Sequence, residues 1–378
     1  MEASASAPGK ILWIGGYSVL ERPNISYVTA VKSYVTVNAR PSGENSLELD
    51  APQLGMRAKG SVDLSTGKVA ADAPKELVLL KTSVEVALRY ASATGAKVQG
   101  LSIRTNNDPQ FSYSIAGGKV VKSGLGSSAA LTVAAIASAL KALEVKANRN
   151  QIHKLAQTAH SIATGKVGSG FDIAAASYGS IIYTRYSPEI VKNLPPDYSN
   201  KELLGLVKKR WDYTAEKFPL PKEFRLTFAN FVGESMITTA SVGSVSEFKK
   251  GSPEAYNEIV GRLNQANVEA VEALRRIGNG EQDAMEAFKG AFDRGRALSK
   301  ELGSMSRVGI EPDDCTSLIE ESKSNGAFVA KLPGAGGKDS IAALSASREE
   351  QTRLRRFWRK RKELGILKLK TSKKGFSS

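Results

Sequence analysis

The first hundred residues place apolar side chains in short runs separated by polar turns, which is the pattern of β-strands and hairpins. Residues 10–14 form an apolar strand, and residues 26–39 mix β-branched and small side chains as a longer one. The turn-rich residues 40–73 indicate a decorated hairpin. Apolar residues near helical spacing then predict a helix over residues 74–94, and a short strand follows at 101–104.

Two further helices are predicted in the middle of the chain. Residues 127–143 carry small and apolar side chains all round, which is typical of a helix buried on most of its faces. The next helix spans about residues 149–164 and leads into the glycine-rich residues 165–170. Five prolines then fall between residues 187 and 223, which makes this stretch the expected inter-domain region.

The rest of the chain alternates strands with helices, and this indicates an α+β fold rather than a doubly wound sheet. A chain of 378 residues exceeds one ordinary core, so we expect domains at 1–190 and 224–378, joined by an inter-domain segment at 191–223. The elements expected in the second domain are strands at 225–231, 327–332, 339–345 and 366–370, and helices at about 253–277, 281–302, 312–324 and 348–363.

The composition is that of a folded protein, with 41% hydrophobic and 24% charged residues. Cys315 is the single cysteine, so the chain can form neither an internal disulfide nor a cysteine metal cluster, and we expect a cytoplasmic protein. No basic segment followed by an apolar run opens the sequence, and no run of about eighteen apolar residues occurs. The expectation is therefore neither secretion nor a membrane partner.

The net charge of +15 is concentrated at one end of the chain. Residues 348–378 hold twelve basic and three acidic residues, which is +9 of the total. A nucleic-acid-binding helix is one interpretation. Leu354, Phe357 and Trp358 lie among these basic residues, and a solvated basic face beside an apolar stripe is the interpretation we favour. We therefore expect no nucleic-acid partner and keep this binding function as the alternative from a different class.

A glycine loop opens the buried helix, in the run of residues 122–130, Lys-Ser-Gly-Leu-Gly-Ser-Ser-Ala-Ala. Gly124 and Gly126 allow the backbone to approach a polyanion, and the helix start offers unpaired N–H groups and the positive end of its dipole. Ser127 and Ser128 are expected to cap the helix, and the Ser128 hydroxyl can also ligate a magnesium ion that bridges phosphates. A plain turn followed by an N-cap is the alternative for such a loop. The run lacks the Walker ending and the later acidic residue of a Rossmann fingerprint.

Three separated segments, in order, resemble the motifs of the GHMP kinases, the family of galactokinase and the homoserine, mevalonate and phosphomevalonate kinases. They are residues 6–17, 122–130 and 331–339, and the resemblance covers essentially the whole chain. It implies an N-terminal domain like that of some ribosomal proteins, with a left-handed βαβ crossover, and a ferredoxin-like C-terminal domain. It also implies ATP and Mg²⁺ as cofactors, and a homodimer is left open.

Within the family, the details are similar to the phosphomevalonate kinase branch. Gly15-Gly16-Tyr17 stands where mevalonate and galactose kinases generally carry Gly-Glu-His, Lys122 precedes the second motif, and residues 156–172 are also similar. The implied reaction is transfer of the γ-phosphoryl group of ATP to 5-phosphomevalonate, giving the diphosphate used in isoprenoid synthesis. Mevalonate kinase, or another small-molecule kinase of the family, is the alternative.

The resemblance also implies site residues. Lys10 could be read as an ordinary surface lysine at the start of a strand, and Asp172 as a helix cap, but both are expected to be catalytic. The offset at which mevalonate kinases carry a metal-ligating glutamate falls on Ser161, and the second-substrate segment, near residues 233–243, is only loosely matched. The expected ATP-binding residues are Asn106, Lys122, Gly124, Leu125, Gly126, Ser127, Ser128 and Ala129, with Ser128 on the metal; the expected acceptor-binding residues are Lys10, Tyr17, Lys166, Ser169, Gly170, Asp172, Gly334, Ala335 and Gly336.

Overall fold

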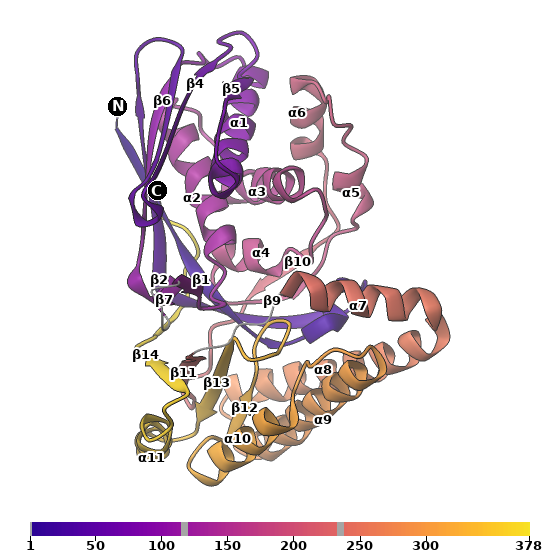
Figure 1. The fold of residues 1–378 in the computed structure, drawn as a ribbon. Helices are drawn as coiled ribbons and strands as arrows, with labels where there is room; N and C mark the ends of the chain where they lie inside the picture. Colours follow the sequence, from indigo (N-terminus) through magenta and orange to yellow (C-terminus); the bar gives the residue numbers. More distant parts are fainter. Residues whose placement is uncertain (1, 115–119, 233–237) are drawn as a thin grey trace.

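The computed structural model describes residues 2–114, 120–232 and 238–378, and in these ranges two separate sheets each carry their own helices (Figure 1). The larger sheet is built around β2, because β1 pairs along most of its length and β9, β15 and β6 pair with successive parts of it. Its order is β10-β9-β2-β6-β3-β4-β5. The strands are β1 (Ala3–Ile14), β2 (Ile25–Pro41), β3 (Ser46–Ala51), β4 (Met56–Val62), β5 (Val69–Ala71), β6 (Leu101–Asn107), β9 (Ile181–Thr184), β10 (Thr214–Lys217) and β15 (Thr371–Ser372).

The strands predicted near the start of the chain are present, but β1 begins seven residues earlier than expected. Lys10 therefore lies inside β1 rather than at its start. The turn-rich stretch contains the β3–β4 hairpin and β5, which pairs with β4. β3 and β6 are parallel, and the chain between them passes through helix α1 (Val78–Ala93), so these elements form the βαβ unit of this domain.

Helices α1 to α4 pack together against the larger sheet, to the right of β1 and β2 in Figure 1. Helix α2 (Ser127–Ala142) is buried on nearly every side, as its small and apolar residues predict. Helix α3 (Arg149–Thr164) has the predicted bounds, because Asn148 and Gln151 form a capping box at its start and Gly165, with φ +69°, ends it. Helix α4 (Phe171–Tyr178) follows.

Residues 191–223, expected to lie between the domains, contain elements that pack on the first domain. Helix α5 (Glu189–Lys192) leads into α6 (Asn200–Lys208), which packs on α1. β10 then pairs with β9 at the edge of the larger sheet. This stretch thus adds a helix and a strand to the N-terminal layers before the chain enters the second sheet.

The second sheet has the antiparallel order β12-β13-β11-β14, which is the ferredoxin-like arrangement implied by the resemblance. The predicted strands and helices are present with small shifts of their ends. Helix α7 was not predicted; it begins at Thr238, and residues 233–237 of the loosely matched acceptor segment lie outside the described residues. The elements are β11 (Arg225–Phe231), α7 (Thr238–Gly251), α8 (Pro253–Gly278), α9 (Ala284–Met305), α10 (Asp313–Ser324), β12 (Val329–Lys331), β13 (Ser340–Ser345), α11 (Arg348–Arg359) and β14 (Leu364–Leu367).

The basic helix α11 has the amphipathic arrangement that we favoured. Leu354 and Trp358 are fully buried, and the Trp358 indole N–H donates to Oγ of Ser322 at 2.8 Å. Arg353 and Arg356 are exposed on the other side. The apolar stripe therefore attaches the helix to the smaller sheet, and the basic face is solvated. None of the helices within the described ranges has the length and apolar character needed to cross a bilayer.

After β14 the chain returns to the larger sheet, where the two ends of the described chain lie close together (Figure 1). β15 pairs with β2, and Ser6 and Ser377 exchange backbone hydrogen bonds of 2.8 and 2.9 Å. The Phe376 N–H donates to the carbonyl of Ala176 in α4 at 2.8 Å. The C-terminal residues thus pack on the domain that the N-terminal residues begin.

Candidate active site

The glycine loop of residues 123–126 lies directly on β1. It is reached through a short hairpin, β7 (Ser112–Ser114) and β8 (Val120–Lys122). The Lys10 N–H donates to the carbonyl of Leu125 at 2.8 Å, and a Cβ atom on Gly9 would lie only 2.9 Å from the same oxygen. Gly9 is therefore required by the close approach of the two backbones.

Helix α2 starts at this loop, but its serines do not cap it. Gly126 is the N-cap, in the left-handed region with φ +80°, and no side chain accepts a capping hydrogen bond. Ser127 and Ser128 lie inside the first turn, so the prediction that they cap the helix was wrong. A capping side chain must precede the helical backbone, and the glycine occupies that place. The helix start keeps its N–H groups and the positive end of its dipole directed at the loop.

Lys10 connects the first motif to the glycine loop. Its Nζ donates to the carbonyl of Gly124 at 2.7 Å and lies 5.6 Å from the centre of the Phe171 ring. A Cβ atom on Gly126 would lie 3.0 Å from Cε of Lys10, so the side chain passes directly beneath the loop. Burial lowers the pKa of Lys10, while the carboxylates of Asp172 and Asp339 act in the opposite direction. This ammonium group is held where phosphates on the loop would be.

Asp172 lies in the first turn of α4, and its carboxylate acts electrostatically on Lys10. Its Oδ1 accepts the backbone N–H of Ile173 at 2.9 Å, and the N-terminal end of the helix dipole favours its negative charge. The residue before the helix, Gly170, has φ +76°, and a Cβ atom there would come within 3.0 Å of both the Gln157 amide and the Tyr183 hydroxyl. Gln157 and Tyr183 therefore pack closely against the backbone at the start of α4, and this fixes the position of Asp172.

The loop before α4 is fixed by hydrogen bonds to its backbone. The Gln157 amide donates to the carbonyl of Gly170 at 2.8 Å, and the Tyr183 hydroxyl donates to that of Ser169 at 3.3 Å. The buried Arg185 donates to the carbonyl of Val167 at 3.1 Å. Ser169 and Gly170 thus contribute an ordered edge to the site.

The third glycine loop, residues 333–337, is fitted against the segment before α10. Gly334, Gly336 and Gly337 all have φ between +70° and +80°. The Gly337 N–H donates to the carbonyl of Ile310 at 2.9 Å, and a Cβ atom on Gly336 would lie 2.1 Å from that oxygen. No side chain fits at residue 336 without moving this contact.

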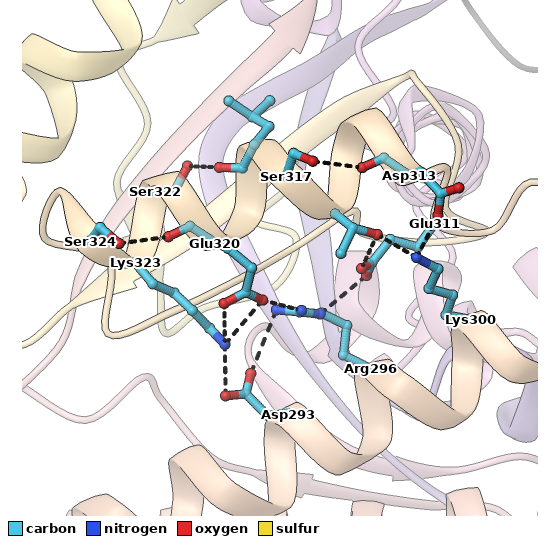
Figure 2. A network of polar contacts seen from close by, with 12 residues as sticks. Asp293, Arg296, Lys300, Glu311, Asp313, Ser317, Glu320, Ser322, Lys323 and Ser324 are labelled. Atoms are coloured by element: carbon cyan, nitrogen blue, oxygen red, sulfur yellow. Dashed lines mark hydrogen bonds and ion pairs between the residues drawn. The ribbon is translucent and has the colours of Figure 1, made fainter.

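Ile310 is itself held by a charge network, shown in Figure 2. Its neighbour Glu311 is buried and pairs with Nε of Arg296 on α9 at 3.2 Å. Thr316 donates to the same carboxylate at 3.0 Å. Burial raises the pKa of Glu311, and Arg296 acts against this shift. The buried pair fixes the segment on which the third loop rests.

Tyr17 joins the first motif to the third. It is almost fully buried, and its hydroxyl donates to the carbonyl of Ala335 at 3.2 Å. Lys331, at the end of β12, donates to the carbonyl of Trp13 at 3.1 Å. The structure therefore places Tyr17 in a packed position from which it supports the Gly334–Gly337 loop.

The third segment also reaches the glycine loop. Oγ of Ser340 lies 3.5 Å from where a Cβ atom of Gly124 would be, and Asp339 acts electrostatically on Lys10. Asp339 is the last residue of the third motif, residues 331–339, and was not among the expected site residues. The three motifs, which are far apart in the sequence, meet around Lys10 and Gly124.

The remaining expected residues are less closely connected to this centre. Ala129 is buried in the first turn of α2. Asn106 on β6, Lys122 at the end of β8 and Lys166 after α3 are all exposed. The sequence did not lead us to expect the parts played by Phe171, whose ring lies near Lys10, and by Gln157, which holds the carbonyl of Gly170. A glutamine among the apolar residues of α3 is a signal that could have pointed to a buried hydrogen bond.

The donor atoms at the α2 start suit a hard cation. Ser128 is half-buried and offers a hydroxyl oxygen, the ligand type that Mg²⁺ accepts together with phosphates and water. Within residues 2–114, 120–232 and 238–378, no three His, Cys, Asp or Glu side chains gather into a metal-binding group. Ser128 is the residue at this helix start that would hold such an ion.

Comparison with known proteins identifies both domains. The family described as "GHMP kinases N terminal domain" matches residues 81–180, and "GHMP kinases C terminal" matches residues 284–364. The phosphomevalonate kinase of Candida albicans is 30% identical, over 91% of this chain and 89% of its own length. That of Saccharolobus solfataricus is 31% identical, over 94% and 93%. The solved phosphomevalonate kinase of Streptococcus pneumoniae, in complex with phosphomevalonate and AMPPNP, has a TM-score of 0.75 at 19% identity and covers 98% of this chain and 99% of that one.

Proposed function

Since the chain belongs to the GHMP kinase family, we propose that it transfers the γ-phosphoryl group of ATP to the phosphate of (R)-5-phosphomevalonate, giving 5-diphosphomevalonate for isoprenoid synthesis. The observation that carries this proposal is identity of 30% or more to two phosphomevalonate kinases over at least 91% of the chain. The convergence of Lys10, the glycine loop and Asp172 supports it, because these groups suit phosphoryl transfer.

ATP would lie with its phosphates at the glycine loop. The first N–H groups of α2 and the helix dipole favour the polyphosphate, and the positive φ angles of Gly124 and Gly126 let the backbone approach it. Ser128 is the residue that would reach a magnesium ion there. An ion held there would supply positive charge against the phosphates during transfer.

The acceptor is an anion, and this sets the task of Lys10. A phosphate monoester has a second pKa near ~6, so it is mostly a dianion at neutral pH and has little proton left to lose. The main barrier is repulsion between two phosphates, which a fixed ammonium group between them offsets. Lys10, whose Nζ donates to the carbonyl of Gly124, supplies this positive charge. Asp172 orients Lys10 and the acceptor. Lys166 is proposed to hold acceptor charge, and Lys122, also expected at the ATP phosphates, is proposed to share this task.

A coupled assay with purified protein, offering mevalonate and phosphomevalonate side by side with MgATP, tests the proposal. We expect ADP release with phosphomevalonate and little with mevalonate. Preference for mevalonate would show that the alternative, a mevalonate kinase, is correct. The nucleic-acid alternative requires salt-dependent binding of DNA or RNA that is lost when the exposed Arg353 and Arg356 of α11 are replaced.

Two further properties belong to this proposal. We place the enzyme in the cytoplasm on the ground of its single cysteine, Cys315, which is buried. Cell fractionation tests this placement. Size-exclusion chromatography distinguishes a monomer from the homodimer that the resemblance leaves open.

A further inference from the structure

Carboxylates from both domains act electrostatically on Lys10. Asp172 lies in α4 of the N-terminal domain, and Asp339 directly precedes β13 of the C-terminal sheet. Among the described residues, these are the two charged groups that act on the Lys10 ammonium. Phe171 presents its ring to the same group, and the carbonyl of Gly124 accepts its hydrogen bond. A residue from the second domain thus belongs to the immediate surroundings of Lys10.

The backbone around Asp339 is fixed close to the glycine loop. The carbonyl of Asp339 accepts the N–H of Phe231 at 3.2 Å, which extends the β11–β13 pairing by one residue. The next side chain, Ser340, has its Oγ 3.5 Å from where a Cβ atom of Gly124 would be. Gly124 is also the residue whose carbonyl holds Lys10. Asp339 therefore adjoins the point where the C-terminal sheet meets the loop.

The charge of Asp339 has a defined effect at this place. Burial lowers the pKa of Lys10, and the carboxylates of Asp172 and then Asp339 raise it. The preceding residue, Lys338, forms its ion pair with Asp314 on α10 at 2.6 Å. The third motif thus includes Lys338, which pairs with a residue of α10, and Asp339, whose charge acts on the lysine of the first motif.

We propose that Asp339 is a positioning residue for phosphoryl transfer, a carboxylate of the C-terminal domain that holds the Lys10 ammonium together with Asp172. This inference rests on the proposed function, because it assigns Asp339 a part in the same reaction. It makes the active lysine depend on contact between the two domains. Asp339 acts through Lys10, without touching the transferred phosphoryl group.

The test compares Asp339→Asn with Asp339→Glu and with Asp314→Asn, which removes the neighbouring carboxylate that pairs with Lys338. We expect Asp339→Asn to lower kcat about ten- to a hundredfold, the range for losing one interaction with a charged group, with smaller changes in both KM values. The alkaline limb of its pH profile should move to lower pH, because Lys10 loses a charge that keeps it protonated. Asp339→Glu should recover part of kcat, and Asp314→Asn should behave like the wild type.

The outcomes separate this inference from the proposed function. A wild-type enzyme that does not use phosphomevalonate contradicts the proposed function. If the wild type uses it and Asp339→Asn keeps the same kcat and alkaline limb, the inference is wrong. It is equally wrong if Asp339→Asn instead raises the concentration of Mg²⁺ needed, since Asp339 would then be a metal ligand. Melting temperatures of all variants, expected within a few degrees of the wild type, show whether a loss of kcat reflects unfolding.

Discussion

Nζ of Lys10 donates a 2.7 Å hydrogen bond to the carbonyl oxygen of Gly124, and this bond joins a strand residue to a loop 114 positions later in the chain. The loop is thereby fixed to the residue that would act on its bound phosphates. Because the carboxylates of Asp172 and Asp339 both act electrostatically on this ammonium group, substitutions of either should alter catalysis more than stability.

Lys10→Met should be severely impaired at every pH, on the order of a hundredfold to a thousandfold in kcat, because the charge that offsets phosphate repulsion is gone. Asp172→Asn should keep measurable activity near pH 8, although its alkaline limb should move to lower pH as in Asp339→Asn, and should lose more activity as the pH falls below the second pKa of the acceptor, about 6. The measurement is kcat against pH with phosphomevalonate for both variants. Equal loss at pH 8, with fold and binding intact, would show that Asp172 is a true general base.

Ser128→Ala should raise the magnesium concentration needed for half-maximal rate and leave the fold intact. Because Gly126 is the N-cap, the hydroxyl of Ser128 is not required to start α2, and the loss of unfolding free energy should stay below about 1 kcal/mol. Ser127→Ala, one residue earlier in the same turn, is the matched control. Unchanged turnover of Ser128→Ala at limiting magnesium would show that Ser128 is not a magnesium ligand.

Gly336→Ala and Gly334→Ala form a matched pair in the third loop. Both glycines have positive φ, but only at residue 336 would the new Cβ meet a backbone oxygen, at 2.1 Å, whereas residue 334 has no atom within 4 Å. Gly334→Ala should therefore cost about 1 kcal/mol of unfolding free energy, from backbone strain alone. Gly336→Ala should cost more and also lower kcat, because the loop must leave Ile310. Similar melting curves for the two variants would contradict this.

Lys122→Met and Lys166→Met should each raise the KM for phosphomevalonate more than the KM for ATP. Both side chains are exposed, so neither change should affect stability by more than about 0.5 kcal/mol. Initial rates over a grid of both substrates give the two constants. If the acceptor KM is unchanged in both variants, these lysines do not hold the acceptor phosphate.

His153 should make the N-terminal domain less stable in mild acid. It lies fully buried between the rings of Tyr178 and Tyr213, and this burial lowers the pKa of its imidazole to about 3. The unfolded chain has the ordinary value of about 6.5, so it binds more protons than the fold between these pH values. The free energy of unfolding should be unaffected above pH 7 and fall by up to about 1.4 kcal/mol per pH unit as the pH drops below 6.

Urea unfolding of the wild type and His153→Phe between pH 5 and 8 measures this effect. The phenylalanine keeps an aromatic ring in the site and cannot titrate, so its stability should vary less with pH. His160→Gln, in the same helix, controls for the loss of a histidine elsewhere in α3. Parallel pH dependences of the wild type and His153→Phe would contradict the prediction.

Sequence predicted the elements whose signals are local. The bounds of α3 follow from Asn148, Gln151 and Gly165, which lie within or beside the helix, and β11 has the expected bounds. The cap of α2 was misassigned, because serine and glycine both favour that position and the choice depends on the approach of β1. Helix α7 follows a stretch with no clear periodicity and was not expected.

The sequence predicted which motifs form the site, but not how their residues are arranged around Lys10. Lys10 and Asp172 were proposed from resemblance, and their proximity is a property of the folded chain. The burial of Tyr17 depends on α8 and the third loop, which lie more than two hundred residues away. Asp339 carried no distinguishing signal, since an aspartate after a lysine in a loop is ordinarily a solvated residue.

The return of the chain from β14 to β15 means that the two sheets are joined at two places, once between β10 and β11 and once between β14 and β15. The second connection is fixed at its end, where the Lys32 N–H donates to the carbonyl of Lys370 at 2.7 Å. Two chain connections allow the sheets fewer relative movements than a single linker would. Residues in these two connections, far from Lys10, therefore help to fix the smaller sheet, which carries Asp339, against the larger one.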